Sequence, residues 1–439
     1  MCSIVGSKNS KEVLKMLKIM KHRAPDGFGV KQYNNFSIGM GRLAIIDLKS
    51  DGLCPYTEDN YTLAFNGELY NYIELRKELK KLGWKFRTSS DIEVVLKSYR
   101  QWGKGCLDKF NGMFSLAIFD GNYVFLARDI AGEKPLYIGT KEFSFASEAK
   151  ALNWKCLEFP PAYYLLWDLR LNVTLKFEPY WKLKKIKINE KTAIKDLEAL
   201  LEDAVKIRTR SDVPYALYYS GGLDSALLST FHRYRHKFTY VDKDYSKEFR
   251  KKFRKILWHL DYPTNSFSAF GLYKLAELAH KKVKVVISGE GADELFGGYV
   301  RYIAPHFNSL AQNKFPSYKS MFGNSMSVSD YGWEEFNGNM QELLRMGDRM
   351  SSAWGIENRC PFLDKRIIQF AFSLPDHLKI NGLETKVILR RILKKRNPKY
   401  RDIEKKGLYC SVPKWLGSEF PLDKTEYIKL QNKLWKKLV

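Results

Sequence analysis

The chain has 439 residues, of which 45% are hydrophobic, and a formal net charge of +25 at pH 7. This length and apolar content predict two or three globular domains, and the six cysteines, which form no C-x-x-C pair, exclude a disulfide scaffold or a zinc ribbon and favour a reducing compartment. Because no apolar run reaches the roughly 18 residues of a membrane span and no signal peptide is evident, we expect a cytoplasmic protein without a membrane partner.

Cys2 is the first residue that suggests chemistry. Removal of Met1 would leave Cys2 with a free α-amine, and the ordinary pKa of such an amine, about 7.7–8.0, suits it to act as a base for the thiol of the same residue. One residue would then supply both nucleophile and base for acyl transfer. A cysteine at the second position is usually incidental, so this interpretation depends on the motifs that follow.

Helix and strand patterns alternate through the first 180 residues. We expect a helix over residues 10–21, with Ser10 as its cap and Val13, Leu14, Leu17 and Met20 on one face. Strands are expected over residues 36–47, 62–65, 114–119, 123–127, 143–146 and 163–177, and helices over 71–82 and 91–102.

Several motifs in this part of the chain stand in a characteristic order. They are Cys2, R-L-A-I-I-D at 42–47, N-G-E-L-Y-N at 66–71, S-D-I-E at 90–93, G-M-F at 112–114 and R-D at 128–129. In this order they resemble class II (N-terminal nucleophile) glutamine amidotransferase domains. The resemblance covers about residues 1–180 and implies a four-layer αββα sandwich, with two sheets between helices.

The resemblance also implies a role for individual residues. Cys2 is the thiol nucleophile, while the Asn66 side chain and the Gly67 backbone N–H form the oxyanion hole. Arg42 binds the carboxylate of glutamine, and Asn66, Glu68 and Asp91 complete the glutamine site. The chemistry agrees, because acyl transfer needs donors aimed at the developing oxyanion and an amino acid needs one cation and one carboxylate. The alternatives are a hairpin turn at 66–67 and an exposed strand arginine.

A lysine-rich link over residues 181–191 and a helix over 192–210 lead to a second motif. An apolar strand over 213–219 runs into S-G-G-L-D-S at 220–225, and a helical pattern follows. Paired glycines let a backbone approach an anion closely, and a helix N-terminus favours phosphate. The hexapeptide looks like the pyrophosphate loop of enzymes that split ATP between its α- and β-phosphates, and the alternative is an ordinary strand-to-helix turn. The residues expected to bind ATP here are Tyr219, Ser220, Gly221, Gly222, Asp224 and Ser225.

Strands and helices continue to alternate beyond this loop, which predicts an α/β fold with a parallel sheet and ligands at the carboxyl ends of its strands. We expect strands over 236–241 and 284–287, helices over 246–259 and 272–280, and mainly helical structure from 300 to 439. Glu290 and Asp293 follow the second of these strands directly. Since Asp224 would repel a phosphate without a cation between them, we interpret Asp224 and Asp293 as Mg²⁺ ligands.

The block S-G-E-G-A-D-E-L-F-G-G-Y at 288–299 combines with G-D-R-M-S at 347–351, G-I-E-N-R-C-P-F-L-D at 355–364 and E-T-K-V-I-L-R at 384–390. Together they resemble the synthetase domain of glutamine-hydrolysing asparagine synthetases, over about residues 190–439. The resemblance implies that ATP and aspartate form β-aspartyl-AMP and that ammonia from the first domain displaces AMP. It assigns Glu290 to acid/base work, Lys386 to charge stabilisation, and Ser288 and Gly289 to nucleotide contact.

The chain departs from this family at three points of the second half. The segment between the 220–225 loop and Ser288 is shorter than usual, Asn358 stands where a small apolar residue is common, and Cys360 stands where valine is common. A related amidotransferase that amidates another carboxylate, on a sugar or a peptide, therefore stays open as an alternative to an asparagine synthetase.

The positive charge raises a third alternative, a nucleic-acid-binding protein on the same scaffold. We regard nucleic acid as the less favoured partner, because the basic runs are dispersed and carry no nucleic-acid motif. The expected partners are the small-molecule substrates glutamine, aspartate and ATP, and the sequence leaves open whether the chain forms a homodimer.

Overall fold

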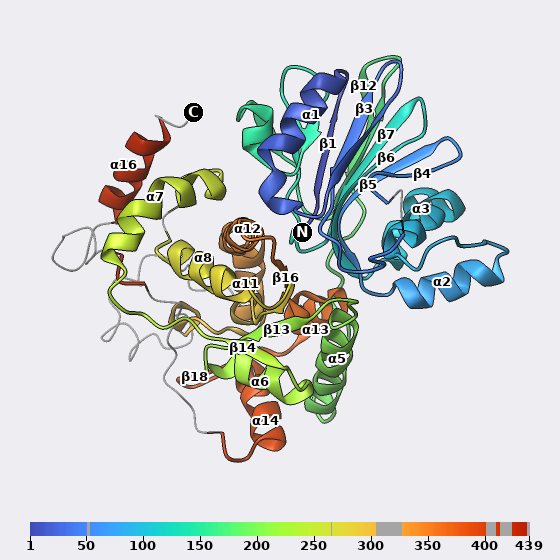
Figure 1. Cartoon of the computed structure of the whole chain (residues 1–439). Helices are drawn as coiled ribbons and strands as arrows, with labels where there is room; N and C mark the ends of the chain where they lie inside the picture. The colour runs from blue at the N-terminus through green and yellow to red at the C-terminus, as the bar shows by residue number, and fades with distance from the viewer. Residues whose placement is uncertain (51–52, 265, 304–326, 401–409, 413–423, 437–439) are drawn as a thin grey trace.

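The computed structural model describes residues 1–50, 53–264, 266–303, 327–400, 410–412 and 424–436. Figure 1 shows two halves that meet around the N-terminus. The helical structure expected beyond residue 300 is present in the described residues, and the parts of that expectation that concern 304–326, 401–409, 413–423 and 437–439 lie outside them.

The first half contains two antiparallel sheets of six strands each. Helix α1 (Ser10–Ile19) packs on the first sheet, α2 (Tyr72–Lys81) and α3 (Asp91–Trp102) lie on the side of the second, and α4 (Cys106–Lys109) is a single turn. This is the expected αββα sandwich (Figure 1). In spatial order the first sheet is β10 (Cys156–Glu158), β8 (Tyr137–Gly139), β9 (Phe145–Ala146), β1 (Ser3–Ser7), β3 (Ser37–Gly41) and β2 (Phe28–Gln32). The second is β12 (Val173–Pro179), β11 (Tyr163–Asp168), β7 (Tyr123–Arg128), β6 (Gly112–Phe119), β5 (Tyr61–Leu69) and β4 (Tyr56–Glu58).

Three local predictions in this half are wrong. Asn9, rather than Ser10, caps α1, because its side chain accepts a hydrogen bond from the Lys11 amide at 2.9 Å. Leu14 is 38% exposed, and Met16 takes the expected place on the buried face. The strand expected over residues 36–47 ends at Gly41, and the chain then leaves the sheet toward Asp47, whose φ is +58°.

The second half is built on a parallel sheet with the strand order β14-β13-β15-β16, as the alternating pattern predicts. Its strands are β13 (Tyr215–Tyr218), β14 (His236–Phe238), β15 (Val285–Ile287) and β16 (Glu357–Arg359), so the strand expected over 236–241 is shorter than predicted. A small hairpin joins β17 (Ile380–Asn381) to β18 (Glu384–Thr385). The helices are α5 (Ala193–Arg208), α6 (Leu223–Phe231), α7 (Ser246–Leu260), α8 (Ser268–Ala279), α9 (Ala292–Phe296), α11 (Val328–Asn337), α12 (Asn339–Ser352), α13 (Lys365–Ser373), α14 (Val387–Arg396) and α16 (Lys424–Trp435).

A buried ionic network joins the two halves. The Arg23 guanidinium, with no solvent exposure, lies 2.9 Å from Glu148 of its own half and 2.7 Å from Asp348 on α12. Arg349 reaches back to within 3.2 Å of Asp261, and the backbone amides of residues 149 and 150 donate to the same carboxylate at 2.6 and 2.8 Å. Buried charges are tolerated when they are paired and hydrogen-bonded, so this network fixes how the halves dock.

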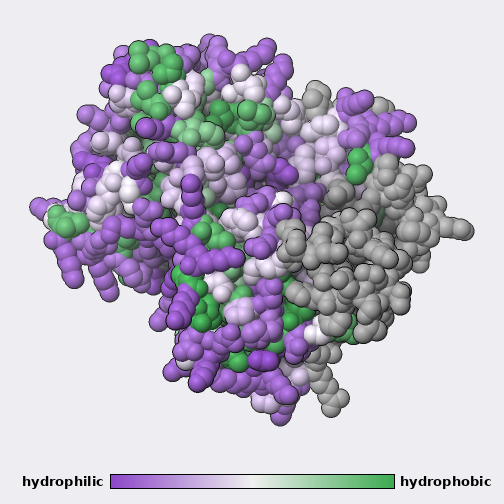
Figure 2. All heavy atoms as spheres, turned by 180° about the vertical axis from the view of Figure 1, so that it is seen from behind, coloured by the Kyte–Doolittle hydropathy of each residue, from purple (hydrophilic) through white to green (hydrophobic). Residues whose placement is uncertain are grey.

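Hydrophilic side chains dominate the face shown in Figure 2, and hydrophobic ones are scattered across it. None of the described helices combines the length and the apolar character that a membrane crossing requires.

Candidate active sites

Cys2 directly precedes β1, where the first sheet faces the second half of the molecule. Its Sγ is 4.0 Å from the carbonyl oxygen of Leu43, and its own carbonyl accepts a hydrogen bond from Arg23 at 3.1 Å. Burial raises the pKa of the thiol, and the nearby carboxylates of Glu357 and Glu68 raise it further, while the adjacent N-terminal amine lowers it. The thiol therefore needs a base close by before it can act as a nucleophile.

Met1 is fully buried beside this cysteine. Its sulfur lies 3.3 Å from Nζ of Lys134 and 3.8 Å from a guanidinium nitrogen of Arg23. Burial lowers the pKa of its α-amine to about 6, although Glu357 acts in the opposite direction. With Met1 in place, the free α-amine belongs to Met1, and the nitrogen of Cys2 is part of a peptide bond. That nitrogen cannot then act as a base for the Cys2 thiol.

Asn66 and Gly67 lie inside β5, where they pair with Ser115 and Phe114 of β6. The hairpin-turn alternative is therefore excluded. The expected strand over residues 62–65 is also too short, because the strand continues through both residues to Leu69. The Asn66 side chain is fully buried, with Nδ2 3.4 Å from the Ser115 hydroxyl and Oδ1 lacking a hydrogen-bond partner among the described residues. A Cβ on Gly67 would come within 2.0 Å of the Met113 carbonyl, so only glycine fits here.

Glu68 and Asp91 are two buried carboxylates of this half. Burial raises the pKa of Glu68 well above its usual range; Arg359 opposes this rise, and Asp91 and Glu357 reinforce it. Asp91 accepts a hydrogen bond from the Leu69 amide at 2.9 Å, and burial raises its pKa to about 6. The half-buried Arg42 donates to the carbonyls of residues 46 and 47, at 3.3 and 2.6 Å.

The second half contributes two charged residues that the sequence analysis did not single out. Arg359 is fully buried in β16, and its Nη2 lies 3.1 Å from Glu68 Oε1. Its Nε donates to Glu357, the other outer residue of the strand, at 2.9 Å. The sequence does contain a signal for this pair, because charged residues stand at positions 357 and 359. Residues two apart in a strand point to the same face.

The loop at 220–225 connects β13 to α6 in the expected order of strand, turn and helix. Gly221 has a φ of +78°, and Gly222 caps the helix. The Ser220 and Ser225 hydroxyls lie 3.1 Å apart, and Ser220 Oγ accepts from the Gly222 amide at 3.3 Å. Tyr219 just before the loop donates its amide to the Phe238 carbonyl at 2.8 Å, which prolongs the pairing with β14.

The loop that follows β15 packs against this first loop. A Cβ on Gly289 would lie 2.9 Å from the Asp224 Cβ, so the two backbones approach closely. Ser288 is buried, and its amide donates to the Arg359 carbonyl at 3.0 Å. The carboxyl ends of β13 and β15 therefore bring together most of the residues predicted to contact the nucleotide.

Lys386 links these two loops through its ammonium group. The Nζ atom lies 2.6 Å from Asp224 and 2.8 Å from Asp293, and the side chain is 4% exposed. Burial acts to lower the pKa of Lys386, but the two carboxylates outweigh it and the net pKa is raised. A Cβ on Gly298 would lie 1.9 Å from Asp293 and 2.1 Å from Lys386, so this position has no room for a side chain.

Glu290 belongs to the same loop after β15, between Ser288 and Asp293. Its Oε2 accepts from Nδ2 of Asn358 at 3.1 Å and from the thiol of Cys360 at 3.7 Å. Burial raises the pKa of Glu290 to about 7; the Cys360 hydrogen bond opposes this rise and Glu294 adds to it. A group with such a pKa can exchange a proton near neutral pH, as acid/base catalysis requires.

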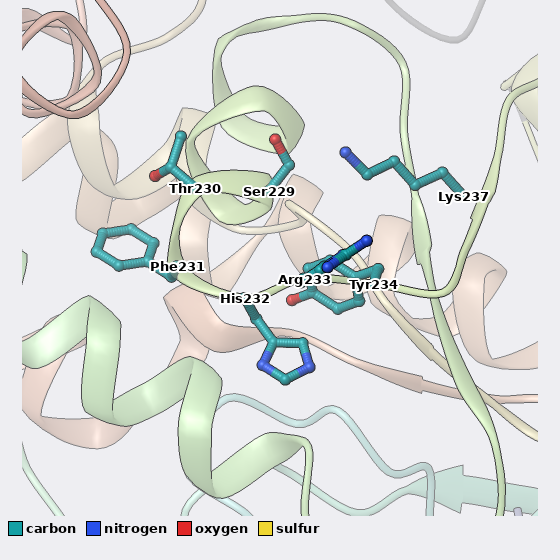
Figure 3. Close-up of a pocket in the computed structure, with 7 residues that line it drawn as sticks. All are labelled: Ser229, Thr230, Phe231, His232, Arg233, Tyr234 and Lys237. Carbon is teal, nitrogen blue, oxygen red and sulfur yellow. The ribbon is translucent and has the colours of Figure 1, made fainter.

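A hollow of about 470 Å³ lies elsewhere, at the C-terminal end of α6 and the start of β14 (Figure 3). Because β13 and β14 are parallel, this hollow lies at the amino end of the sheet, opposite the 220–225 loop. Its volume is therefore no evidence for the nucleotide site. Its lining residues are Ser229, Thr230, Phe231, His232, Arg233, Tyr234 and Lys237.

Comparison with known proteins gives the same two-part picture. A family model described as a glutamine amidotransferase domain matches residues 1–164, and one described as asparagine synthase matches residues 196–241, 231–341 and 333–420. The chain is 28% identical to an asparagine synthetase [glutamine-hydrolyzing] 1 of Bacillus subtilis, over 95% of this chain and 88% of that protein. It is 33% identical to a putative asparagine synthetase of Methanocaldococcus jannaschii, over 72% and 78%, and 31% identical to a probable one of Schizosaccharomyces pombe, over 87% and 76%.

The fold and these matches define a glutamine amidotransferase half joined to an ATP-dependent ligase half. The chain belongs to the asparagine synthase family. One break in the second match falls at residues 231–241, directly after α6, and the Bacillus alignment extends over 559 positions, more than this chain contains. Both observations agree with a shortened segment after the 220–225 loop.

Proposed function

We propose that this protein makes asparagine from aspartate, with ATP as the energy source and glutamine as the nitrogen donor. The observation that supports this most directly is the position of β16, which lies between the residues proposed to bind glutamine and the residue proposed for acid/base work in the synthetase half. Arg359 pairs with Glu68 on one side of the strand, and Asn358 donates to Glu290 on the other. Domain limits of about 1–180 and 190–439 form part of the proposal.

In the first reaction Cys2 attacks the side-chain amide carbon of glutamine. The carbon–sulfur bond forms, the carbon–nitrogen bond breaks, and ammonia leaves with a proton delivered through the Cys2 amine. Asn66 Nδ2 and the Gly67 N–H are the proposed donors to the oxyanion. Arg42 would bind the substrate carboxylate, and Glu68 and Asp91 its ammonium group. Water then hydrolyses the thioester to glutamate.

In the second reaction the β-carboxylate of aspartate attacks the α-phosphorus of ATP, and pyrophosphate leaves. The backbone N–H groups and hydroxyls of the 220–225 loop suit the departing pyrophosphate. Tyr219, Ser288 and Gly289 stand around the same strand ends and are the proposed nucleotide contacts. Lys386 would balance the charge that develops on the phosphate, because its ammonium already lies at the meeting point of the two loops.

The residues at this point also fit a Mg²⁺ ion. Asp224 and Asp293 lie close enough to share the ammonium of Lys386, at 2.6 and 2.8 Å, and two neighbouring carboxylates offer the oxygen ligands that Mg²⁺ prefers. When bound, Mg²⁺ would neutralise charge on the phosphates of ATP. Among the described residues, no group of three His, Cys, Asp or Glu side chains is arranged around a metal position, so the phosphates would have to supply further ligands.

The test is pyrophosphate release in the presence of ATP, Mg²⁺ and aspartate, with either ammonium chloride or glutamine. We expect release with both nitrogen sources and asparagine as the product. A Cys2→Ala variant should lose the glutamine-dependent reaction and keep the ammonia-dependent one. If aspartate gives no release while another carboxylic acid does, the acceptor is that acid and the proposal is wrong.

A further inference from the structure

Asn358, the inner residue of β16, and Cys360, directly after the strand, have no role of their own in the two reactions described above. In a strand, successive side chains point to opposite faces, so Glu357 and Arg359 share one face and Asn358 and Cys360 share the other. Arg359 reaches the glutaminase half through Glu68. Asn358 and Cys360 both reach Glu290.

The two contacts fall on a single oxygen of Glu290. Asn358 Nδ2 and the Cys360 thiol approach Oε2 at 3.1 and 3.7 Å, while Gly347 of α12 packs against the same carboxylate. The Ser288 hydroxyl lies 3.6 Å from the Cys360 sulfur and so belongs to the same cluster. Two donors on one oxygen fix the plane of the carboxylate and direct the other oxygen, Oε1, away from the strand.

The Asn358 amide has a second feature. The residue is 7% exposed, and its Oδ1 has no hydrogen-bond partner among the described residues. A buried acceptor without a partner is costly, because it has lost water and gained nothing in exchange. An unpaired buried acceptor beside a proposed acid/base group therefore points to a ligand that carries N–H donors.

We propose that Asn358 and Cys360 form a positioning pair for Glu290 in the ammonia-transfer step, and that Oδ1 of Asn358 accepts an N–H of the incoming ammonia. This proposal rests on the synthetase function proposed above. Asn358 thereby binds a substrate as well as positioning Glu290, whereas Cys360 acts through Glu290 alone.

The nitrogen lone pair of ammonia attacks the acyl carbon of the adenylate, and a carbon–nitrogen bond forms. Glu290 Oε1 takes one proton from that nitrogen, the bond from carbon to the phosphate oxygen breaks, and AMP leaves with its electron pair. Acceptors at Oδ1 and Oε1 would hold two N–H groups of ammonia and leave its lone pair directed at the carbon.

Several charged or titratable groups besides this pair face Glu290 and enter its pH dependence. Glu294 of α9 raises the pKa of Glu290, and Lys134 of the first half lowers it. Tyr218 of β13 lies close enough for Glu290 to raise its pKa. Glu133 of the first half interacts with Cys360. The variants below leave all four groups in place.

The first experiment measures kcat of ammonia-dependent synthesis against pH, at a fixed concentration of free NH₃. Loss of a hydrogen bond to the ionised carboxylate raises the pKa of Glu290, so Asn358→Ala should move the acid limb to higher pH by about one unit. Cys360→Val should move it in the same direction, and Cys360→Ser, which keeps a donor, should restore the original midpoint.

The second experiment separates the two roles of Asn358. We expect Asn358→Ala to raise KM for ammonia by about tenfold and Cys360→Val to leave that KM unchanged. Matched controls are Asn339→Ala, which removes an amide donor to Glu335 at 2.9 Å in the α11–α12 region, and Cys410→Val, a buried cysteine of another core. Neither control should alter the profile or KM.

The outcomes also separate this proposal from the function on which it rests. Aspartate-dependent exchange of pyrophosphate into ATP needs no ammonia. If the unaltered protein shows no such exchange, the proposed synthetase function is contradicted, and the positioning of Glu290 is still to be judged by its own measurement. That measurement is an infrared difference titration of the protonated Glu290 carboxyl, whose band is identified because it is absent from Glu290→Gln. It reports the same shift in the pKa of Glu290 without turnover. If Asn358→Ala changes neither the Glu290 midpoint nor, where synthesis occurs, KM for ammonia, the positioning proposal is wrong.

Discussion

Burial alters the protonation of the residues that the two sites depend on. It raises the pKa of Asp91 to about 6 and that of Glu290 to about 7, and it lowers the pKa of the Met1 amine to about 6. For all three, the form that carries charge has lost water without full compensation. Each site thus contains groups that change protonation near neutral pH, as proton transfer requires.

The presence of Met1 should decide whether the glutaminase works. Protein that retains Met1 should show glutaminase activity lower by at least about a hundredfold, because the amine next to Cys2 is then part of a peptide bond and cannot act as a base. Ammonia-dependent synthesis should be unchanged. The measurement is glutamate release from processed and unprocessed protein, with the N-terminus of each established by mass spectrometry, and equal release from both would contradict the expectation.

At the level of the element, β16 has three residues and touches both candidate sites. Its parallel pairing with β15 sets the register Val285–Glu357, Val286–Asn358 and Ile287–Arg359. That register directs Arg359 to Glu68 and Asn358 to Glu290. A displacement of this strand would therefore move residues of both candidate sites together.

Substitutions on the two faces of β16 should separate the two reactions. Arg359→Met removes the cation that lowers the pKa of Glu68, so the pKa of Glu68 should rise further, its carboxylate should be less available to the substrate ammonium, and KM for glutamine should rise tenfold or more. Synthesis from ammonia should continue, which is the opposite of the pattern expected for Asn358→Ala.

Arg359 also donates to the carbonyls of residues 208 and 210 at 2.9 and 2.7 Å, so thermal unfolding must be followed in parallel. Arg359→Lys keeps a charge near Glu68 and should recover part of the glutamine affinity. Arg170→Met, which removes an exposed arginine paired with Asp168, is the matched control. An unchanged KM for glutamine in a folded Arg359→Met protein would show that Glu68 does not need this partner.

On the scale of the whole molecule, the docking of the two halves depends on charge pairs buried between them. Arg23 and Asp348 have side chains that are 0% and 2% exposed and approach to 2.7 Å. Burial acts to raise the pKa of Asp348, but Arg23 outweighs it and the net pKa is lowered. The pair therefore holds the halves in one arrangement across the neutral pH range.

Breaking this pair from one side should destabilise the protein strongly. Arg23→Met should lower the free energy of unfolding by about 3–5 kcal/mol, because it leaves a buried carboxylate without its main partner. Since Arg23 depresses the folded pKa of Asp348, the stability that the pair contributes is fully present above about pH 4, the ordinary range of a carboxyl, and is lost as the pH falls through the folded value, so the effect of Arg23→Met should shrink at acid pH.

Urea unfolding at several pH values measures this effect. Lys109→Met, which breaks a surface pair with Glu78 whose members are 36% and 45% exposed, should change the unfolding midpoint little at any pH. A double variant with Arg23→Met and Asp348→Leu should recover much of the loss, since no isolated charge is then buried. Equal effects of Arg23→Met and Lys109→Met would contradict a special role for the buried pair.

The sequence by itself determined the features whose causes are local. The helices α2 and α3 end just before Gly83 and Gly103 as expected, because glycine readily adopts the positive φ, here +92° and +55°, that ends a helix. The strand, turn and helix around the 220–225 loop follow from the order of apolar residues and glycines. Motif order identified the family and the fold class, and the catalytic and ligand-binding roles of Cys2, Asn66, Glu290 and Lys386 stay predictions.

The tertiary structure alone decided which of these residues meet. Arg359 and Glu68 are almost 300 positions apart, and nothing in the neighbourhood of either predicts that they form a pair. The same holds for Arg23 with Asp348 and for Lys386 between Asp224 and Asp293. Periodicity reports whether a position is buried, but the partner of a buried charge is set by how separate elements dock. That docking also placed Asn66 and Gly67 inside a strand and left Asn358 and Cys360 facing Glu290.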